Sequence, residues 1–364
     1  MFAVNVLYLL PSANIYGGTP QKTLDLVKGS RNRSIVYFWS DAYSDKHILF
    51  RQAGAGIYSG AYGRNVFRHV RFIVDLIDMY SIDLIQTQFS FGEVLGYFAK
   101  LMRPRVKLIV TFEGSLKPSL LRRLILKWIY HHVDNFIYIS EYVKKEKLVS
   151  FPMLESLPGR VIYNGSNLLA QSVRCSAPSS PYKILDVAGL TPIKNISTLI
   201  RAVGIMVHDM DKRNVELIVA GEGPERGNLE RLIFDLHLAR NVHLIGYRDD
   251  IGDLLCQCAV FAHPSVAEGF GIAVTEAMMT GLPVVAADAG ALPELIIDGE
   301  SGLLVNPLDA EKWAEVISKL MKDPVLAKQI ADNGRIRALN LFSTERFVSN
   351  YENMYEMVVN RQRI

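Results

Sequence analysis

The amino-acid sequence predicts an α/β protein with two doubly wound, parallel-sheet domains. Short apolar runs alternate with longer stretches of helical periodicity along almost the whole chain, a pattern typical of strands joined by crossover helices. The length of 364 residues also exceeds what one hydrophobic core usually carries. A small, polar stretch at 168–181 interrupts the alternation and is interpreted as a linker. We therefore expect one domain over 1–167 and a second over 182–343.

Buried parallel strands are expected wherever a short apolar run precedes a helical stretch. In the first domain these runs lie at 4–10, 34–39, 82–87, 106–112 and 136–140, with helices for example at 19–28 and 91–101. A further strand at 161–163 precedes Asn164-Gly165, which is a strong turn signal. In the second domain the runs lie at 182–188, 215–220, 242–245, 260–262, 284–286 and 302–305. Helices are expected at 196–208, 226–238, 274–280, 309–322, 324–340 and 344–360.

The composition is that of an ordinary globular protein. Hydrophobic residues make up 49% of the chain and charged residues 21%, which argues against disorder. No apolar run reaches the ~20 residues that cross a bilayer, and the segment 1–10 lacks the basic start of a signal peptide and is better interpreted as a strand. The cysteines Cys175, Cys256 and Cys258 give neither a disulfide framework nor a four-ligand metal site, so we expect a cytoplasmic protein. Cys256 and Cys258 lie in a helical run and are expected to be inert thiols.

The net charge of +3 conceals an uneven distribution. Residues 1–170 carry 21 Lys and Arg against 12 Asp and Glu, whereas residues 171–364 carry 19 against 25. Within the basic half, Arg122, Arg123, Lys127 and Trp128 lie in a helical pattern rich in Leu and Ile at 118–132. This helix either packs as scaffold with its cations in water, or also contacts the anionic inner face of the cytoplasmic membrane. No nucleic-acid-binding motif accompanies the basic charge, so no nucleic-acid partner is expected.

The most informative segment is 264–281. After a strand that ends near 262, a Glu-Gly-Phe-Gly loop begins at Glu268, and a helix is expected near 274 with Glu276 in its first turn. Glycines let the backbone approach a ligand closely, and the N–H groups at a helix start can hold an anion. Because carboxylates accept hydrogen bonds from sugar or ribose hydroxyls, the two acids suit a sugar-phosphate ligand. Glu276 could equally complement the helix dipole.

Weaker signals follow other strands. Lys194 comes after the first strand of the second domain, where it either neutralises a diphosphate or faces solvent. Gly17-Gly18 follows the first strand of the first domain and either approaches a ligand or forms a plain turn. The stretch 221–227 nearly matches a dinucleotide fingerprint, but its last glycine is one residue late and Pro224 intrudes. The Asp-x-Asp pattern at 209–211 is interpreted as a helix end and the histidines form no ligand pattern, so no metal site is expected.

Taken together, these stretches resemble the retaining glycosyltransferases of family four, which have the two-domain GT-B architecture. The resemblance runs through AGEGPE, HLIGYRDD, HPSVAEGFGIAVTEAMMTGLPVVAADAG and ELIIDGESGLLVNPLD, and includes the Glu-x7-Glu spacing of Glu268 and Glu276. A looser match through the GGT loop and VIYNGSN extends it over the first half. The resemblance implies two domains that face each other across a cleft, with a helix at 344–364 crossing back onto the first domain.

Residue roles are also implied by the resemblance. Glu268 would contact hydroxyls of the donor sugar, Glu276 would bind the nucleotide ribose, and Lys194 would neutralise the diphosphate. The donor-binding set is Gly17, Gly18, Gly221, Phe270, Gly271, Ile272 and Glu276.

Two positions depart from the family pattern. The family usually has an Arg five residues before the lysine, where this chain has Gly189. It usually has a His in a T-x-H-G pattern after the strand at 106–112, where this chain has Glu113. One diphosphate cation is therefore missing, and a carboxylate replaces an imidazole near the expected reaction centre. Glu113 accordingly joins Lys194 and Glu268 as a candidate catalytic residue.

The function implied by the resemblance is transfer of a hexosyl unit from a nucleotide-diphosphate sugar to a hydroxyl of a glycan or lipid-linked acceptor. Retention of configuration, no metal and no cofactor are expected, in the synthesis of cell-surface polysaccharide or lipopolysaccharide. UDP-sugars are slightly favoured over GDP-sugars as donors. One alternative, which Gly189 and Glu113 favour, is a catalytically silent nucleotide-sugar-binding subunit that supports a partner transferase. A second, based on the stretch 221–227, is a nicotinamide-dependent oxidoreductase.

Overall fold

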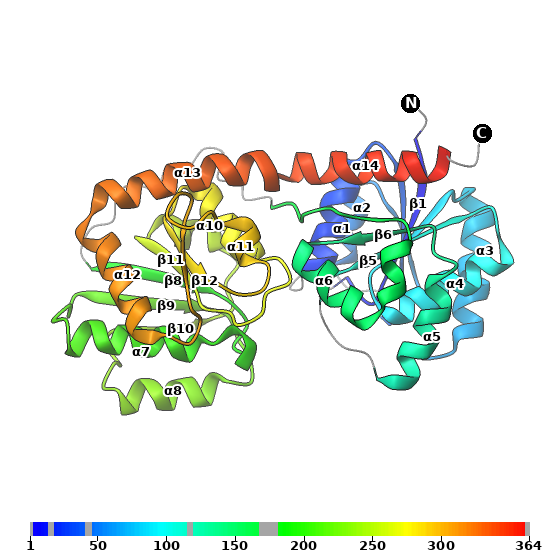
Figure 1. The fold of residues 1–364 in the computed structure, drawn as a ribbon. Helices are drawn as coiled ribbons and strands as arrows, with labels where there is room; N and C mark the ends of the chain where they lie inside the picture. The colour runs from blue at the N-terminus through cyan, green and yellow to red at the C-terminus, as the bar shows by residue number, and fades with distance from the viewer. Residues whose placement is uncertain (1–2, 14–17, 41–45, 115–118, 167–180, 361–364) are drawn as a thin grey trace. The chain divides into compact units, whose positions relative to one another are not determined.

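The structure is a computed structural model that describes residues 3–13, 18–40, 46–114, 119–166 and 181–360 (Figure 1). The chain divides into two compact units. Unit 1 comprises residues 1–165 and 344–364, and unit 2 comprises residues 166–343. Apart from Pro181, the expected linker at 168–181 lies outside the described residues, as does Cys175. The domain boundaries drawn from the sequence therefore stay predictions.

Unit 1 is built on a seven-stranded parallel sheet in the order β3-β2-β1-β4-β5-β6-β7. Its strands are β1 (Asn5–Leu10), β2 (Arg33–Phe38), β3 (Gly56–Ser59), β4 (Leu84–Thr87), β5 (Lys107–Phe112), β6 (Asn135–Tyr138) and β7 (Gly159–Val161). The central strands are almost wholly buried, which explains their continuous apolar sequences. The order reverses between β1 and β4, where ligands of doubly wound sheets bind.

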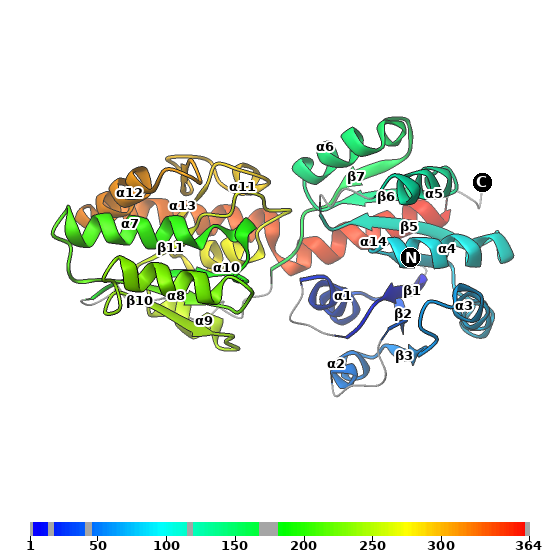
Figure 2. The same ribbon diagram turned by 90° about the horizontal axis from the view of Figure 1, so that it is seen from below.

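Helices cover both faces of this sheet (Figure 2). They are α1 (Gly18–Gly29), α2 (His47–Gln52), α3 (Val66–Tyr80), α4 (Ser90–Met102), α5 (Leu120–Tyr130), α6 (Glu141–Ser150) and α14 (Thr344–Asn360), with a 3₁₀ turn η1 (Pro152–Ser156). The chain's last helix, α14, packs on α1 and contributes six side chains to the core: Phe347, Val348, Tyr351, Met354, Tyr355 and Val358. Their spacing of three and four residues is that of one helix face. Tyr355 also hydrogen-bonds Gln86 on β4, so α14 is an integral part of unit 1.

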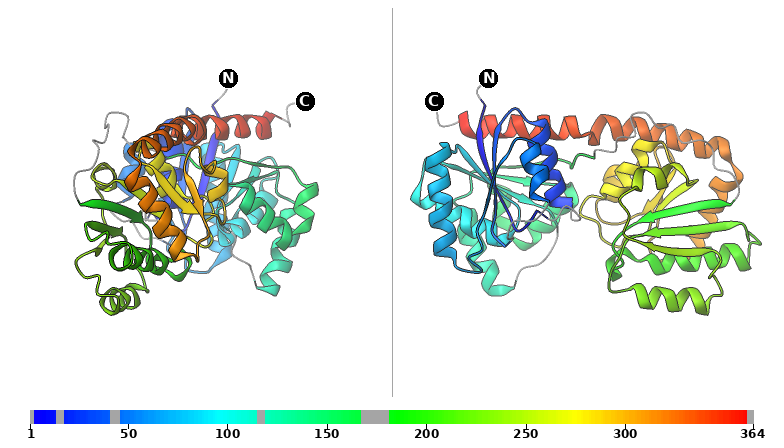
Figure 3. Two further views of the ribbon diagram at one scale, coloured as in Figure 1. Left: turned by 60° about the vertical axis from the view of Figure 1, so that its left-hand side comes forward. Right: turned by 180° about the vertical axis from the view of Figure 1, so that it is seen from behind.

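Unit 2 repeats this architecture with a six-stranded parallel sheet in the order β10-β9-β8-β11-β12-β13. Its strands are β8 (Tyr182–Val187), β9 (Val215–Ala220), β10 (Val242–Gly246), β11 (Val260–His263), β12 (Val284–Ala287) and β13 (Leu303–Val305). The helices are α7 (Ile196–His208), α8 (Arg226–Asp235), α9 (Ile251–Cys256), α10 (Ile272–Thr280), α11 (Leu292–Leu295), α12 (Ala310–Lys322) and α13 (Pro324–Phe342), with a 3₁₀ turn η2 (Pro192–Lys194). Figure 3 shows α7 and α8 together along one face of this sheet.

The predicted fold of two doubly wound parallel-sheet domains is confirmed, and each strand expected in the second half is present. The sequence did not predict β3, and it placed the strand near 161 two residues late. Both β3 and β7 are edge strands of four or fewer residues with exposed or half-buried positions, so they lack a clear apolar run. None of the described helices is long and apolar enough to cross a membrane.

Candidate functional site

The candidate site in unit 2 lies where the strand order reverses, between β8 and β11. Lys194 ends η2 in the loop that follows β8, and Glu268 lies in the loop that follows β11. Because β8 and β11 are paired and parallel, their following loops meet at the carboxyl edge of the sheet. The structure therefore brings these two predicted site residues together from positions 74 residues apart.

Four charged side chains form a continuous array at this edge. Lys194 pairs with Oε2 of Glu268, and the same oxygen lies 3.2 Å from Nε2 of His263. The other ring nitrogen, Nδ1, lies 2.8 Å from Oδ1 of Asp186, a fully buried residue of β8. We call Asp186, His263, Glu268 and Lys194 the charged array. Its two acids alternate with its two basic groups, so each charge has an opposite neighbour.

The array holds two of its members, His263 and Glu268, in their charged forms. Burial lowers the pKa of His263, but the charge of Asp186 and the hydrogen bonds that the ring donates to Asp186 and Glu268 outweigh burial and raise that pKa to about 9. Burial raises the pKa of Glu268, but His263 and Lys194 outweigh it and lower that pKa to about 2. At neutral pH the imidazolium therefore donates from both ring nitrogens, one to each carboxylate.

Backbone contacts hold the Lys194 loop against the loop that follows β11. Asn195 has a left-handed backbone with φ of 52°, and its side-chain amide donates to the carbonyls of Pro264 at 3.2 Å and Pro307 at 2.6 Å. The amide of Val266 donates to the carbonyl of Ile193 at 2.9 Å. Asparagine tolerates this backbone better than most residues. These bonds position the lysine and the glutamate relative to each other.

Gly290 supports the backbone of Glu268 from the loop after β12. Its φ is 61°, and a Cβ at this position would lie 2.5 Å from the amide nitrogen of Glu268. The next residue, Ala291, donates its amide hydrogen to the carbonyl of Glu268 at 2.9 Å. Any side chain at 290 would push the Glu268 loop away, so this position requires glycine.

At the start of α10, where an anion site is predicted, the structure has a glycine followed by a helix N-terminus. Gly271 precedes the helix with φ of 108°, and α10 begins at Ile272. The Phe270 side chain is buried against Phe342, so any contact of this residue with a ligand would have to use its backbone. The prediction that Glu276 lies in the first turn is wrong, because the helix begins two residues earlier than expected and Glu276 is its fifth residue. Compensation of the helix dipole, which acts within the first turn, therefore explains this acid less well.

Gly221 has a packing role in the structure. A Cβ there would lie 2.0 Å from the carbonyl oxygen of Ala188, and one at Gly223 would lie 2.3 Å from that of Leu190. The two glycines thus let the loop after β9 press against the loop after β8. Gly189 is exposed, and the nearest atom to a Cβ added there is the carbonyl oxygen of Glu222 at 3.7 Å.

Unit 1 carries the remaining predicted residues. Glu113 follows β5 and forms an ion pair with Lys22 of α1, whose side chain is only 7% exposed. Gly18 is the first residue of α1, and Gly17 lies outside the described residues. Arg122, Arg123, Lys127 and Trp128 are all exposed on α5.

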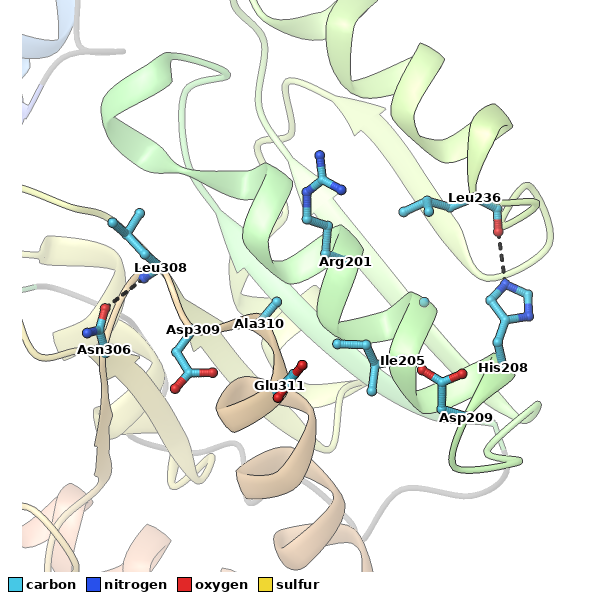
Figure 4. A pocket seen from close by; sticks show the side chains of 11 residues that line it. Arg201, Ile205, His208, Asp209, Leu236, Asn306, Leu308, Asp309, Ala310 and Glu311 are labelled. Carbon is cyan, nitrogen blue, oxygen red and sulfur yellow. Dashed lines mark hydrogen bonds between the residues drawn. The ribbon is translucent and has the colours of Figure 1, made fainter.

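A separate hollow of about 700 Å³ lies between α7 and the start of α12 (Figure 4). Arg201 and His208 of α7 line it together with Asp309 and Glu311. None of the predicted site residues lines this hollow, so the hollow is not part of the candidate site. Among the described residues, no cluster of three or more His, Cys, Asp or Glu side chains could hold a metal ion.

Comparisons with known proteins assign the chain to a class. A family model described as glycosyl transferases group 1 matches residues 172–337, and a second, described as glycosyltransferase family 4, matches residues 23–168. An Anabaena protein solved with UDP and glucose has the same fold, with a TM-score of 0.82 and 24% identity over 96% of this chain and 99% of that chain. The chain is a glycosyltransferase of the GT-B type.

Two curated relatives of the glycosyltransferase have named activities or pathways. The N-acetyl-alpha-D-glucosaminyl L-malate synthase of Bacillus anthracis is 27% identical over 76% of this chain and 74% of the relative. A lipopolysaccharide core biosynthesis glycosyltransferase of Rhizobium meliloti is 29% identical over 53% of this chain and 56% of the relative.

Sequence reasoning missed two members of the charged array in the glycosyltransferase. Asp186 lies within the run 182–188 that is expected to be a buried strand, and His263 directly follows the expected strand 260–262. The histidines form no metal-ligand spacing, so neither residue is predicted to belong to the site. The available signal was a polar residue inside or just after an apolar strand, since a buried Asp or His needs a partner. The supporting residues Asn195 and Gly290 gave only turn signals.

Proposed function

We propose that this glycosyltransferase moves a hexosyl unit from a nucleotide-diphosphate sugar to a sugar hydroxyl of a glycan or glycolipid, with retention of configuration and without a metal. The observation that carries the proposal is the charged array at the switch point of a nucleotide-fold sheet. It combines a carboxylate, which binds hydroxyls, with an ammonium, which binds phosphate. The helix α10 begins four residues after that carboxylate.

The array leaves hydrogen-bonding capacity for such a donor. Both contacts to Glu268 use Oε2, and no described residue hydrogen-bonds Oε1. The side chain is 16% exposed, so Oε1 can accept hydrogen bonds from sugar hydroxyls. Lys194 is 23% exposed and uses one of its three N–H bonds on Glu268, which leaves two for phosphate oxygens. The amides at the start of α10 add positive potential for the diphosphate, and Glu276 is proposed to bind the ribose.

In the proposed reaction, the bond between the anomeric carbon and the diphosphate oxygen breaks as the bond to the acceptor oxygen forms on the same face. The acceptor proton passes to the leaving phosphate oxygen. Negative charge grows on the diphosphate during this step, and Lys194 and the α10 amides stabilise it. Because these groups lie fixed before the reaction, the proposal requires no metal ion.

The acceptor class and the nucleotide base of the donor are proposed from two relatives. The Rhizobium relative is named for lipopolysaccharide core biosynthesis, which supports a glycan or glycolipid acceptor. The Anabaena structure holds UDP and glucose, which supports a uridine donor over a guanosine donor. Product NMR with a panel of UDP- and GDP-sugars would test retention, because the anomeric proton coupling distinguishes the two configurations.

The decisive test is the variant Glu268→Gln. It keeps the shape of the side chain but removes the charge that both Lys194 and His263 contact. We expect kcat to fall about 100- to 1,000-fold, while the Kd for the nucleoside diphosphate stays within about threefold. Glu300→Gln, an exposed change in the same unit, is the matched control and should retain wild-type turnover. Near-normal turnover by Glu268→Gln would reject the role of this carboxylate.

A second candidate is a nucleotide-sugar-binding subunit without turnover of its own. Two positions favour it. Glu113 stands where the family pattern has a histidine, and its carboxylate is paired with Lys22. Gly189 stands where the family pattern has an arginine, so that cation is missing. The purified full chain distinguishes the two candidates. Transfer to a glycoside acceptor supports the enzyme, whereas thermal stabilisation by UDP-sugars without any transfer supports the subunit.

A further inference from the structure

Helix α5 presents apolar side chains to solvent on the side where an ordinary amphipathic helix is polar. Five large residues are exposed: Leu120 by 75%, Leu121 by 71%, Leu124 by 59%, Ile125 by 47% and Trp128 by 55%. We call them the α5 face. Single exposed apolar residues are common on protein surfaces, but five on one three-turn helix form a contiguous patch. The expectation that the apolar residues of this helix pack as scaffold is therefore wrong for most of them.

The helical geometry separates α5 into an inner and an outer side. At about 100° per residue, the five residues of the α5 face fall within an arc of roughly 140°. The three buried residues, Leu126, Ile129 and Tyr130, occupy the opposite side and anchor the helix to unit 1. One of these anchors, Tyr130, donates a hydrogen bond to the buried Glu93 of α4 at 3.0 Å. Of the α5 face, Trp128 also contacts α4 through Tyr97, whereas the helix is held to unit 1 mainly by these three buried residues.

Cations border the α5 face on both sides. On the same helical projection, Arg122 lies beyond one edge of the apolar arc, and Arg123 and Lys127 lie beyond the other. Within the described part of the chain, these three cations form no ion pair, and α5 contains no acidic residue. Each cation is exposed, so each can contact an external anion.

The neighbouring helix α4 extends the patch. Phe98, Leu101 and Met102 are exposed by 42%, 50% and 52%. The two helices are in contact, and the ring of Trp128 lies 4.8 Å from that of Tyr97 on α4. The apolar surface is therefore broader than one helix.

We propose that the α5 face docks on an anionic lipid bilayer. Apolar side chains flanked by Lys and Arg match the acyl boundary and the phosphates of such a surface, and a Trp suits its interfacial layer. A second copy of the chain fits less well, because a symmetric contact through this face would bring the same unpaired cations of both copies together. Docking would bring the enzyme to a lipid-linked acceptor, and this role rests on the proposed function. The docking itself does not depend on the proposed function.

Vesicle co-sedimentation of the full chain tests the proposal. With vesicles of phosphatidylglycerol and phosphatidylcholine in equal parts, we expect binding that weakens with salt, and little binding to phosphatidylcholine alone. The triple variant Leu121→Gln, Leu124→Gln, Ile125→Gln should lower the partition coefficient about a hundredfold. The triple variant Arg122→Gln, Arg123→Gln, Lys127→Gln should lower it about fivefold for each charge removed.

The matched control is the triple variant Val325→Gln, Ile336→Gln, Leu339→Gln, which removes exposed apolar residues from α13 of unit 2 and should bind vesicles as the wild type does. All variants should keep the wild-type melting temperature, since the changed residues are exposed. The Leu121, Leu124 and Ile125 triple should also retain turnover with a water-soluble acceptor, so that a failure of docking is distinguished from a failure of catalysis.

Three results would overturn the proposal. One is a wild-type chain that stays in the supernatant with anionic vesicles at low salt. Another is equal binding by the wild type and the apolar triple variant. The third is a wild-type dimer that the apolar triple variant converts to monomer without any vesicle binding, which would assign the α5 face to a second copy of the chain. A wild-type chain that binds anionic vesicles but transfers no sugar to any acceptor would reject the proposed function and leave the docking proposal standing.

Discussion

The two units each carry a lysine–glutamate ion pair beyond the carboxyl edge of their sheet, and the pairs differ in what surrounds them. In unit 1, Lys22 of α1 contacts Glu113 after β5, with the two side chains 7% and 14% exposed. In unit 2, Lys194 contacts Glu268, with exposures of 23% and 16%. The unit 2 pair continues into His263 and Asp186, whereas in unit 1 no second cation of the described residues forms an ion pair with Glu113.

The difference indicates different roles for similar pairs. A buried ion pair that neutralises itself contributes little net stability, but removing one partner leaves an uncompensated charge. The unit 1 pair fits this description, because the Lys22 side chain is almost fully buried. In the unit 2 pair, His263 supplies a second positive charge to Glu268, so Lys194 can interact with a ligand while Glu268 stays paired. We therefore expect changes in unit 2 to alter turnover, and changes in unit 1 to alter stability.

The largest effect is expected from Lys194→Met. This change removes the ammonium that the proposed mechanism places on the leaving diphosphate, while His263 continues to compensate Glu268. We expect kcat/KM to fall about 100- to 1,000-fold with the melting temperature nearly unchanged. Steady-state kinetics and thermal unfolding of the same preparation measure both quantities. An equal loss of kcat/KM in Lys22→Met would remove the distinction between the two pairs.

The next effect concerns the stability of unit 1. Lys22→Met leaves the Glu113 carboxylate unpaired, and we expect it to lower the free energy of unfolding by about 3 kcal/mol. The double variant Lys22→Met, Glu113→Gln removes both charges and should recover most of that loss. Urea unfolding followed by circular dichroism measures the difference between the variants. If the double variant is fully stable but has lost turnover, Glu113 acts in catalysis as the sequence predicted.

The fold could be predicted from the sequence because parallel strands that are buried on both sides leave continuous apolar runs. Strands such as β8, β9 and β11 of unit 2 appear within one residue of their expected bounds. Edge strands such as β3 leave no such run, because their side chains are half exposed. The start of α10 was placed two residues late, because Gly271 precedes the helix and Ile272 and Ala273 carry no capping signal.

The site was predictable only where function leaves a local pattern. Lys194 and Glu268 follow strands that pair at the switch point, so topology alone brings them together. The contact of His263 with Asp186 depends on the register of β11 beside β8, which a single sequence does not specify. The exposed α5 face was hidden for a similar reason, since periodicity shows that a helix is amphipathic but not which of its sides is packed.

The smallest of the predicted effects tests whether Asp186 and His263 of the charged array contribute to turnover. Asp186 touches only His263 in the array, so we treat it as a positioning residue. Asp186→Asn can still accept a hydrogen bond from Nδ1 but no longer supplies the charge that raises the pKa of His263 to about 9. The pKa of the imidazole should then fall toward about 6.5, its ordinary value.

The pH dependence gives this prediction its sign. In the wild type the raised pKa of His263 stabilises the fold fully below pH ~6.5, and that contribution is lost as pH rises through about 9. In Asp186→Asn the imidazole should lose its proton near neutral pH, and Glu268 then lacks the imidazolium that donates to it. We therefore expect kcat at pH 8 to fall about tenfold while KM for the donor changes little. The exposed change Asp235→Asn is the control and should keep the wild-type profile. If Asp186→Asn lowers kcat equally at pH 6 and pH 8, the residue acts through packing. The Lys194–Glu268 pair would then not depend on the charge of His263, and this difference from the Lys22–Glu113 pair would disappear.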